Sequence, residues 1–289
     1  MRILAIDIGG TKVRAGIVRD AGVTDVRHIP TLAHLGGESL LSRVLTFART
    51  YGAVDGVAIA SAGVISNGVV IAATDTIPGW VGTDLGGAFD CPTTVLGDVH
   101  AHGLGEARLG AGRGHQSSLV VAIGTGIGGA MIEQGRLHLG AESVAGHIGH
   151  IDYHGPEAPQ CSCGRSGHIE AIASGLAVTT AYERATSVRC GGAEIDERAE
   201  TGEKAAVTIV TEAGTALGRG LGSAANLLNP SAIILSGSMT KSGATWWQAV
   251  GRGFRASAMS VVENTPIIRG TLGDEAPLLG AAIFHQEYR

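Results

Sequence analysis

The hydrophobic positions along the chain follow two periods, one of about two residues and one of between three and four. An apolar run at 3–8 leads into a polar glycine turn and then into an alternating segment over 13–18, which predicts a β-hairpin. Apolar residues at helical spacing predict a helix over about 39–51. The continuous apolar run at 56–63 predicts a buried strand.

The rest of the chain yields further elements by the same two periods. In chain order we expect a hairpin over 65–71 with its turn at 66–68, a loop at 74–80, a helix between Trp80 and Thr93, a strand at 93–98, a helix over about 99–108, a strand–turn–strand unit over 118–140, a loop over 142–167, helices over 170–189 and 205–228, a strand at 231–237, and helices near 246–256 and from about 276.

The strand–turn–strand unit at the start of the chain recurs about 115 residues later, again with a glycine-rich turn. A repeated supersecondary unit implies two related half-domains. We therefore expect an N-terminal α/β domain over 1–115 and a C-terminal α/β domain over 116–289, with the last helix, about 277–289, packing back on the first domain. Two glycine loops would then face one cleft.

Composition limits the class of protein. The 289 residues include 46 glycines without a collagen period, and 44% hydrophobic against 16% charged residues allow a full core. The net charge of -5, with its 21 Lys and Arg scattered, argues against nucleic acid and anionic membranes as partners. The longest apolar stretch, about 119–132, is broken by glycines, and the first residues lack a signal-peptide pattern. We expect a cytoplasmic protein with a small-molecule partner.

The second glycine turn, 124–129, formally matches the dinucleotide-binding pattern G-x-G-x-x-G. That pattern needs a helix directly after it, whereas the following residues alternate like a strand, so an NAD enzyme is disfavoured. Glycine turns also expose backbone amides that bind anions. Both turns are therefore candidate phosphate loops, with purely structural hairpins as the alternative.

Asp98 stands between the strand at 93–98 and the helix that follows. At such a position a carboxylate commonly caps the helix. The same placement allows it to accept a proton from an attacking hydroxyl in a kinase. The sequence leaves both roles open.

The densest chemistry lies between His147 and Glu170, where histidines, cysteines and acids gather. Zinc takes four N or S ligands, and Cys161, Cys163 and His168 supply three at suitable spacing. The fourth comes from one of three upstream histidines, among which spacing does not choose: His147, His150 and His154. Buried structural thiols are the alternative.

Taken in order, DIGGTK at 7–12, the Asp at 98, GTGIGG at 124–129, AGHIGH at 145–150 and CSCGRSGHIE at 161–170 resemble the ROK family of sugar kinases and related repressors. The resemblance extends over essentially the entire chain. It implies an α/β, actin-like and hexokinase-like (ribonuclease H-like) fold with two domains and an interdomain cleft. It also implies ATP and Mg²⁺ as cofactors, a structural Zn²⁺, transfer of the γ-phosphoryl group to a sugar 6-hydroxyl, and a homodimer or homotetramer.

The resemblance also assigns roles to individual residues. Asp98 becomes the general base. The nucleotide-binding residues are Asp7, Gly9, Gly10, Thr11, Lys12, Gly124, Thr125, Gly126, Gly128 and Gly129. The sugar-binding residues are Gly63, His147, His150 and Glu170, and the zinc ligands are His150, Cys161, Cys163 and His168.

The chain departs from the family pattern at four places. Gly97 replaces an Asn before the base, Thr76 replaces an Asn in the N-L-P-G-W loop, His168 replaces a Cys, and His147 replaces a Glu of the glucose-type members. His147, with the surrounding motif, is similar to bacterial N-acetylmannosamine kinases. This favours N-acetylmannosamine as substrate, with glucose and N-acetylglucosamine as alternatives.

Two functions of other classes remain to be weighed. A sugar-responsive repressor is disfavoured because DIGGTK begins at residue 7, which leaves no room for a DNA-binding segment before it. A non-catalytic sugar-binding protein is disfavoured because Asp98 and both glycine loops are present.

Overall fold

The computed structural model describes residues 1–74, 76–153 and 159–288 of the chain. Packing within the chain divides it into two compact units. The first unit comprises Met1–Gln116, Ala130–Ala145 and Gly270–Arg289, and the second comprises Ser117–Gly129 and Gly146–Arg269. The domain boundary near residue 115 stays a prediction.

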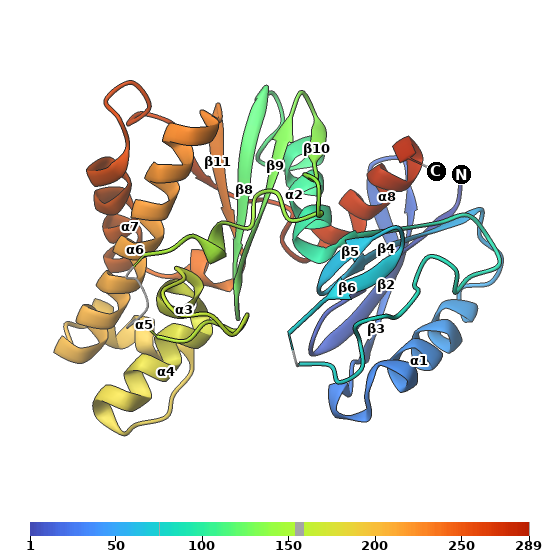
Figure 1. The fold of residues 1–289 in the computed structure, drawn as a ribbon, viewed down its shortest axis with the longest axis horizontal. Helices are drawn as coiled ribbons and strands as arrows, with labels where there is room; N and C mark the ends of the chain where they lie inside the picture. Colours follow the sequence, from blue (N-terminus) through green and yellow to red (C-terminus); the bar gives the residue numbers. More distant parts are fainter. Residues whose placement is uncertain (75, 154–158, 289) are drawn as a thin grey trace. The chain divides into compact units, whose positions relative to one another are not determined.

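The first unit is built on a five-stranded sheet of order β3-β2-β1-β4-β7 (Figure 1). Its strands are β1 (Ile3–Ile8), β2 (Lys12–Arg19), β3 (Gly22–Pro30), β4 (Gly56–Ser61) and β7 (Thr93–Gly97). The other elements are η1 (Ala33–Leu35), α1 (Gly37–Arg49), the hairpin β5 (Val64–Ser66) and β6 (Val69–Ala72), α2 (Asp98–Leu109), η4 (Gly273–Glu275) and α8 (Ala276–Tyr288). β1 pairs antiparallel with β2 and parallel with β4, which pairs parallel with β7.

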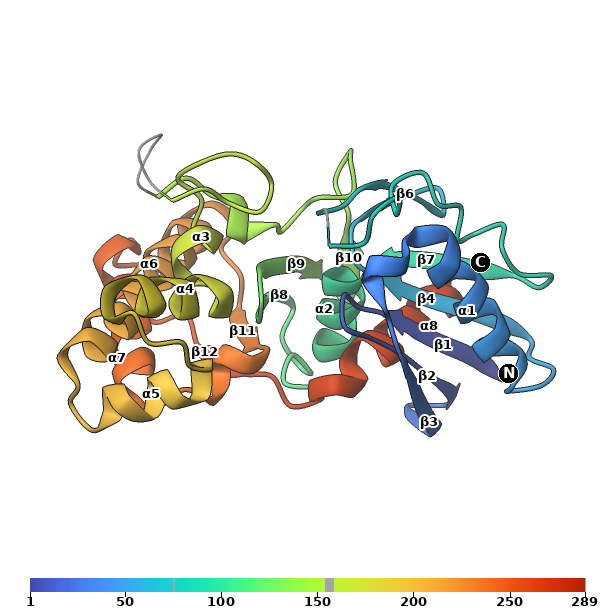
Figure 2. The ribbon, with the colours of Figure 1, turned by 90° about the horizontal axis from the view of Figure 1, so that it is seen from below.

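Both faces of this sheet are covered, as the continuous apolar run of β1 requires. Leu4 and Ile6 belong to the core cluster that contains the apolar residues of α1. Ile3 and Ala5, which alternate with them, belong to the cluster that contains residues of α2 and α8. The two-residue period of a strand thus places α1 on one face and the α2–α8 pair on the other (Figure 2).

The second sheet has the order β10-β9-β8-β11-β12, so it repeats the strand order of the first sheet. Its strands are β8 (Ser117–Ile123), β9 (Ile127–Glu133), β10 (Arg136–His138), β11 (Ala232–Ser236) and β12 (Ile267–Arg269). The helices of the second unit are η2 (Ile148–His150), α3 (Glu170–Ala173), α4 (Gly175–Thr186), α5 (Gly192–Glu200), α6 (Lys204–Leu228), η3 (Ser238–Lys241) and α7 (Ala244–Ser257).

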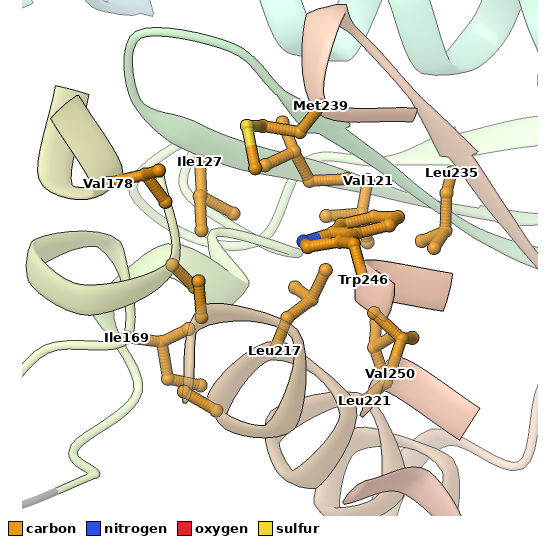
Figure 3. Close-up of a cluster of buried hydrophobic side chains, with 14 of the residues drawn as sticks. Val121, Ile127, Ile169, Val178, Leu217, Leu221, Leu235, Met239, Trp246 and Val250 are labelled. Atoms are coloured by element: carbon orange, nitrogen blue, oxygen red, sulfur yellow. The ribbon is translucent and has the colours of Figure 1, made fainter. Parts of the chain in front are cut away.

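The core of the second unit surrounds Trp246 of α7, which is fully buried. Figure 3 shows its indole ring close to Leu217 of α6 and Val121 of β8. Burying a large apolar side chain of this kind stabilises the fold by roughly 1.5–3 kcal/mol relative to leaving it exposed. The helices are therefore fixed on the sheet that carries the second glycine loop.

Most elements expected from the sequence are confirmed, including the two glycine-turn hairpins and the strand, rather than a helix, after Gly124–Gly129. The expected helix between Trp80 and Thr93 is wrong, because this segment consists of turns and bends. Gly82 has φ of +91°, and the Asp84 carboxylate accepts a hydrogen bond from the Gly87 N–H at 2.8 Å. Among the described residues, no helix combines the length and apolar character needed to cross a membrane.

Candidate functional site

The parallel strands β1, β4 and β7 of the first unit end side by side, at the same edge of the sheet. Ile8 of β1 pairs with Ser61 of β4, and Ser61 pairs with Gly97 of β7. Loops that follow the carboxyl ends of parallel strands gather at one edge of a sheet, where α/β proteins bind ligands. The first glycine loop, Gly63 and Asp98 therefore lie at the same edge.

The first glycine loop is closed by its own backbone and by one buried side chain. The Gly9 N–H donates to the Lys12 carbonyl oxygen at 3.1 Å, and the buried Thr31 hydroxyl donates to the Gly9 carbonyl oxygen at 2.7 Å. Gly10, Thr11 and Lys12 are exposed at the tip. The loop is thus held from behind while its tip stays accessible to a ligand.

Asp98 is the first residue of α2 and is half-buried. The N-cap is Gly97, and the Asp98 carboxylate accepts a hydrogen bond from the adjacent Val99 N–H at 2.8 Å, so helix capping from the N-cap position does not explain this carboxylate. Burial, and next the negative charge of Asp7, raise the pKa of Asp98 to about 7. A carboxylate with a pKa near neutrality is suited to general acid–base chemistry.

Asp7 is joined to an ion-pair network. Its Oδ2 lies 2.8 Å from the Arg14 guanidinium, and Arg14 lies 3.0 Å from Asp274 of η4. The Lys12 ammonium also lies 3.0 Å from Asp274. Burial raises the pKa of Asp7, against the lowering effect of Arg14.

The second glycine loop connects β8 to β9 in the second unit. The Gly124 N–H donates to the Gly126 carbonyl oxygen at 2.9 Å, which closes the turn. Thr125 is exposed at its tip, whereas Gly128 and Gly129 already belong to β9. The turn of the second glycine loop therefore lies at 124–126.

Glu170 connects the second glycine loop to the loop that precedes α3. Its Oε2 accepts from the Ile127 N–H at 2.8 Å, and its Oε1 accepts from the Ser162 hydroxyl at 2.5 Å. A Cβ on Gly126 would lie 2.6 Å from Oε2, so a larger residue at this position would displace the Glu170 carboxylate. The Cys161 thiol lies 3.4 Å from Oε1.

The structure brings His150, Cys161, Cys163 and His168 together, and we name these residues the Cys/His cluster. Their donor atoms all lie within 4.8 Å of one another. An isolated bridge between Asp152 and His168 aligns the two segments that carry them. Of the three upstream histidines, only His150 is a member of this cluster. The His147 ring stacks on the His150 ring, with the ring centroids 6.3 Å apart. His154 lies outside the described residues.

Three donor–donor separations in the Cys/His cluster can be compared with those of a tetrahedral zinc site, and two of them agree with it. The separations are 3.6 Å for Cys161 Sγ to His150 Nδ1, 3.2 Å for Cys163 Sγ to His168 Nδ1 and 3.3 Å between the two Nδ1 atoms. Zinc bond lengths in a regular tetrahedron give about 3.6 Å for an N–S edge and about 3.3 Å for an N–N edge. Two nitrogens and two sulfurs are also donors that zinc prefers.

Comparison with known proteins identifies the family. The model of the ROK family matches residues 3–288. The chain belongs to the ROK family. Its α/β fold is actin-like, as expected from the sequence, and is shared with solved ROK sugar kinases.

Relatives of this ROK protein include two kinds of sugar kinase. An N-acetylmannosamine kinase of Escherichia coli O157:H7 is 30% identical, with 99% of each chain covered. A glucokinase of Halalkalibacterium halodurans is 27% identical, over 96% of this chain and 92% of the relative. The structure of a ROK family glucokinase from Streptomyces griseus, in complex with glucose and AMPPNP, has a TM-score of 0.84 at 28% identity and covers 99% of this chain and 100% of its own.

Four residues of the ROK site region were not found from the sequence. Thr31 and Ser162 each hold a candidate site residue through a hydroxyl group, and Arg14 and Asp274 form the ion-pair network. The sequence signal for Arg14 is that it is the one charged residue between Val13 and Val18, the apolar part of β2. Asp274 carries none, since its partners lie near the opposite end of the sequence.

Proposed function

We propose that this ROK protein is an ATP-dependent sugar kinase that phosphorylates the 6-hydroxyl group of an N-acetylhexosamine, with N-acetylmannosamine as the preferred acceptor. The observation that carries the proposal is Asp98, a half-buried carboxylate with its pKa raised to about 7, at the sheet edge that also holds the first glycine loop. The Streptomyces griseus glucokinase, whose structure contains glucose and AMPPNP, supports ATP as the phosphoryl donor.

Asp98 would act as the general base. It accepts the proton of the sugar hydroxyl while the hydroxyl oxygen forms a bond to the γ-phosphorus and the bond from that phosphorus to the leaving oxygen of ADP breaks. Mg²⁺ would neutralise phosphate charge during the transfer. Since phosphoryl transfer needs little covalent help, most of the acceleration would come from positioning.

The two glycine loops would bind the phosphates through backbone N–H groups, which form anion-binding nests in glycine turns. The exposed residues Gly10–Lys12 of the first loop, and the exposed Thr125 with the half-buried Gly126 of the second, are the segments able to do so. Lys12 adds a cation at the first loop, where its present partner is the exposed Asp274.

Sugar recognition would use Gly63, His147, His150 and Glu170. Glu170 has an acceptor position left beyond those used by Ile127, Ser162 and the Cys161 thiol, because an ionised carboxylate offers about four. His147 can donate or accept, whereas the Glu of glucose-type members only accepts when ionised. This difference favours N-acetylmannosamine over glucose.

The Cys/His cluster would hold a structural zinc ion. Cys161 and Cys163 would bind as thiolates and His150 and His168 through Nδ1, the atoms that already converge. The ion would fix the segments that carry His150 and Glu170, without taking part in phosphoryl transfer.

A sugar panel tests the proposal. In a coupled ADP-release assay with N-acetylmannosamine, N-acetylglucosamine, glucose and mannose, we expect the highest kcat/KM with N-acetylmannosamine. A preference for glucose would make the protein a glucokinase instead. Sugar binding in calorimetry with no turnover on any of the four would overturn the kinase proposal in favour of a non-catalytic binding protein.

The pH dependence of kcat/KM should reveal the ionisation of Asp98. Because Asp98 must be deprotonated to accept the hydroxyl proton and its pKa is raised to about 7, kcat/KM for the sugar should rise with pH up to about 7 and then level off. Below that pH it should fall roughly tenfold per pH unit. Initial rates from pH 5 to 9 at constant ionic strength measure this, and an acid limb near pH 4 would contradict it.

A further inference from the structure

Arg14 is a charged residue in the middle of the first hairpin, with a side chain only 11% exposed. One guanidinium nitrogen lies 2.8 Å from Asp7 Oδ2, and the other lies 3.0 Å from Asp274 Oδ2. Asp7 is in β1 and Asp274 is in η4, so Arg14 joins two segments from opposite ends of the chain. Such a two-sided ion pair holds both carboxylates in a fixed geometry.

Asp7 is in turn the charged neighbour of Asp98. Ile8 pairs with Ser61, and Ser61 pairs with Gly97 on the neighbouring strand. Asp7 directly precedes Ile8, and Asp98 directly follows Gly97. We propose that Arg14 is a positioning residue of the kinase, which holds the Asp7 carboxylate in a fixed ion pair beside the base and so sets the charge that Asp98 experiences. This inference rests on the proposed kinase function.

The other charges in this region do not replace Arg14. Lys12 and Asp274 have side chains 51% and 75% exposed, so water screens their effects on Asp7. His102, one turn after Asp98 on α2, is influenced by Glu106, Arg14 and Asp274, but burial lowers its pKa and it stays neutral near pH 7.

The direction of the effect follows from electrostatics. Arg14 favours the ionised form of Asp7, and the negative charge of Asp7 adds to burial in raising the pKa of Asp98. Without Arg14 the charge of an ionised Asp7 is no longer balanced by a neighbouring cation, so it repels the Asp98 carboxylate more strongly and Asp98 loses its proton at a higher pH. For Arg14→Gln we expect the acid limb of kcat/KM to move upward by roughly one pH unit.

The experiment compares four variants by the pH dependence of kcat/KM for the sugar that the wild-type protein phosphorylates. Arg14→Gln should move the acid limb upward, and Arg14→Lys, which keeps the charge, should restore most of the shift. Asp274→Asn removes a negative charge from the other side of Arg14 and should leave the limb in place or move it slightly downward. Arg19→Gln, at the exposed end of the same strand, is the matched control and should behave as wild type.

An unmoved acid limb in a folded Arg14→Gln protein would overturn the inference, and a raised KM for ATP alone would instead make Arg14 a nucleotide contact. Thermal melting establishes folding, and Arg14→Lys keeps the test valid if Arg14→Gln does not fold. Carboxyl ¹³C NMR of aspartate-labelled protein follows the titration of Asp98, assigned with Asp98→Asn, without turnover. Failure of the proposed function is distinguishable, because the wild-type protein itself would then phosphorylate no sugar.

Discussion

Replacing Asp98 by Asn should lower kcat for sugar phosphorylation by roughly 10²- to 10⁴-fold, the usual contribution of a general base. Asn keeps the shape of the side chain and its carbonyl oxygen still accepts from the Val99 N–H, so α2 should begin unchanged. Only the ability to take up the hydroxyl proton is lost. Steady-state rates of ADP release at saturating ATP and sugar measure the effect.

The matched control for this substitution is Asp90→Asn, an exposed acid in the segment before β7. It should retain the wild-type kcat. Calorimetry should show that Asp98→Asn still binds ATP and sugar, because the change removes a catalytic group and leaves both glycine loops in place. A kcat within about tenfold of wild type would contradict the assignment of Asp98 as the base.

Replacing Cys161 by Ser should reduce the zinc content from about one ion per chain to near zero, because a structural site needs all four ligands. Cys161 is the buried member of the Cys/His cluster, and its sulfur also lies 3.4 Å from Glu170 Oε1. Loss of the ion should therefore release the segment that positions Glu170. The kcat/KM for the sugar should fall by at least about tenfold.

Elemental analysis of protein purified without added metal measures the zinc content. Cys190→Ser is the matched control, since this half-buried thiol in the same unit lies outside the cluster, and it should leave both metal content and activity unchanged. Wild-type protein without zinc would contradict the prediction. The cluster would then be held by its own hydrogen bonds, and His168 would not serve as a ligand.

The elements that the sequence missed are those that contribute little to a core. β3 is an edge strand with mostly exposed residues, so it lacks the apolar alternation that indicates a strand. In α5 only Ile195 and Ala199 are buried, too few to show a helical period. The helix wrongly expected between Trp80 and Thr93 fails because glycines and a side-chain hydrogen bond from Gly87 to Asp84 stabilise turns there.

The candidate site could be predicted where its residues are close in sequence. The Cys/His cluster spans a short segment, and three of its four members followed from spacing and residue type. Spacing did not choose between the upstream histidines, because the choice of His150 depends on how the chain turns and on the bridge that aligns Asp152 with His168. Resemblance to the ROK family had indicated His150.

The sequence by itself determined the two glycine loops, the strand that follows each of them, the position of Asp98 at a strand end and the family. These features depend on local periodicity and on motifs of a few residues, which a chain carries wherever it folds. Only the tertiary structure decided that Asp274 pairs with Arg14 and Lys12, that Glu170 accepts from Ile127, and that burial and then the charge of Asp7 raise the pKa of Asp98. Charge interactions depend on distance and burial in space, and sequence separation determines neither.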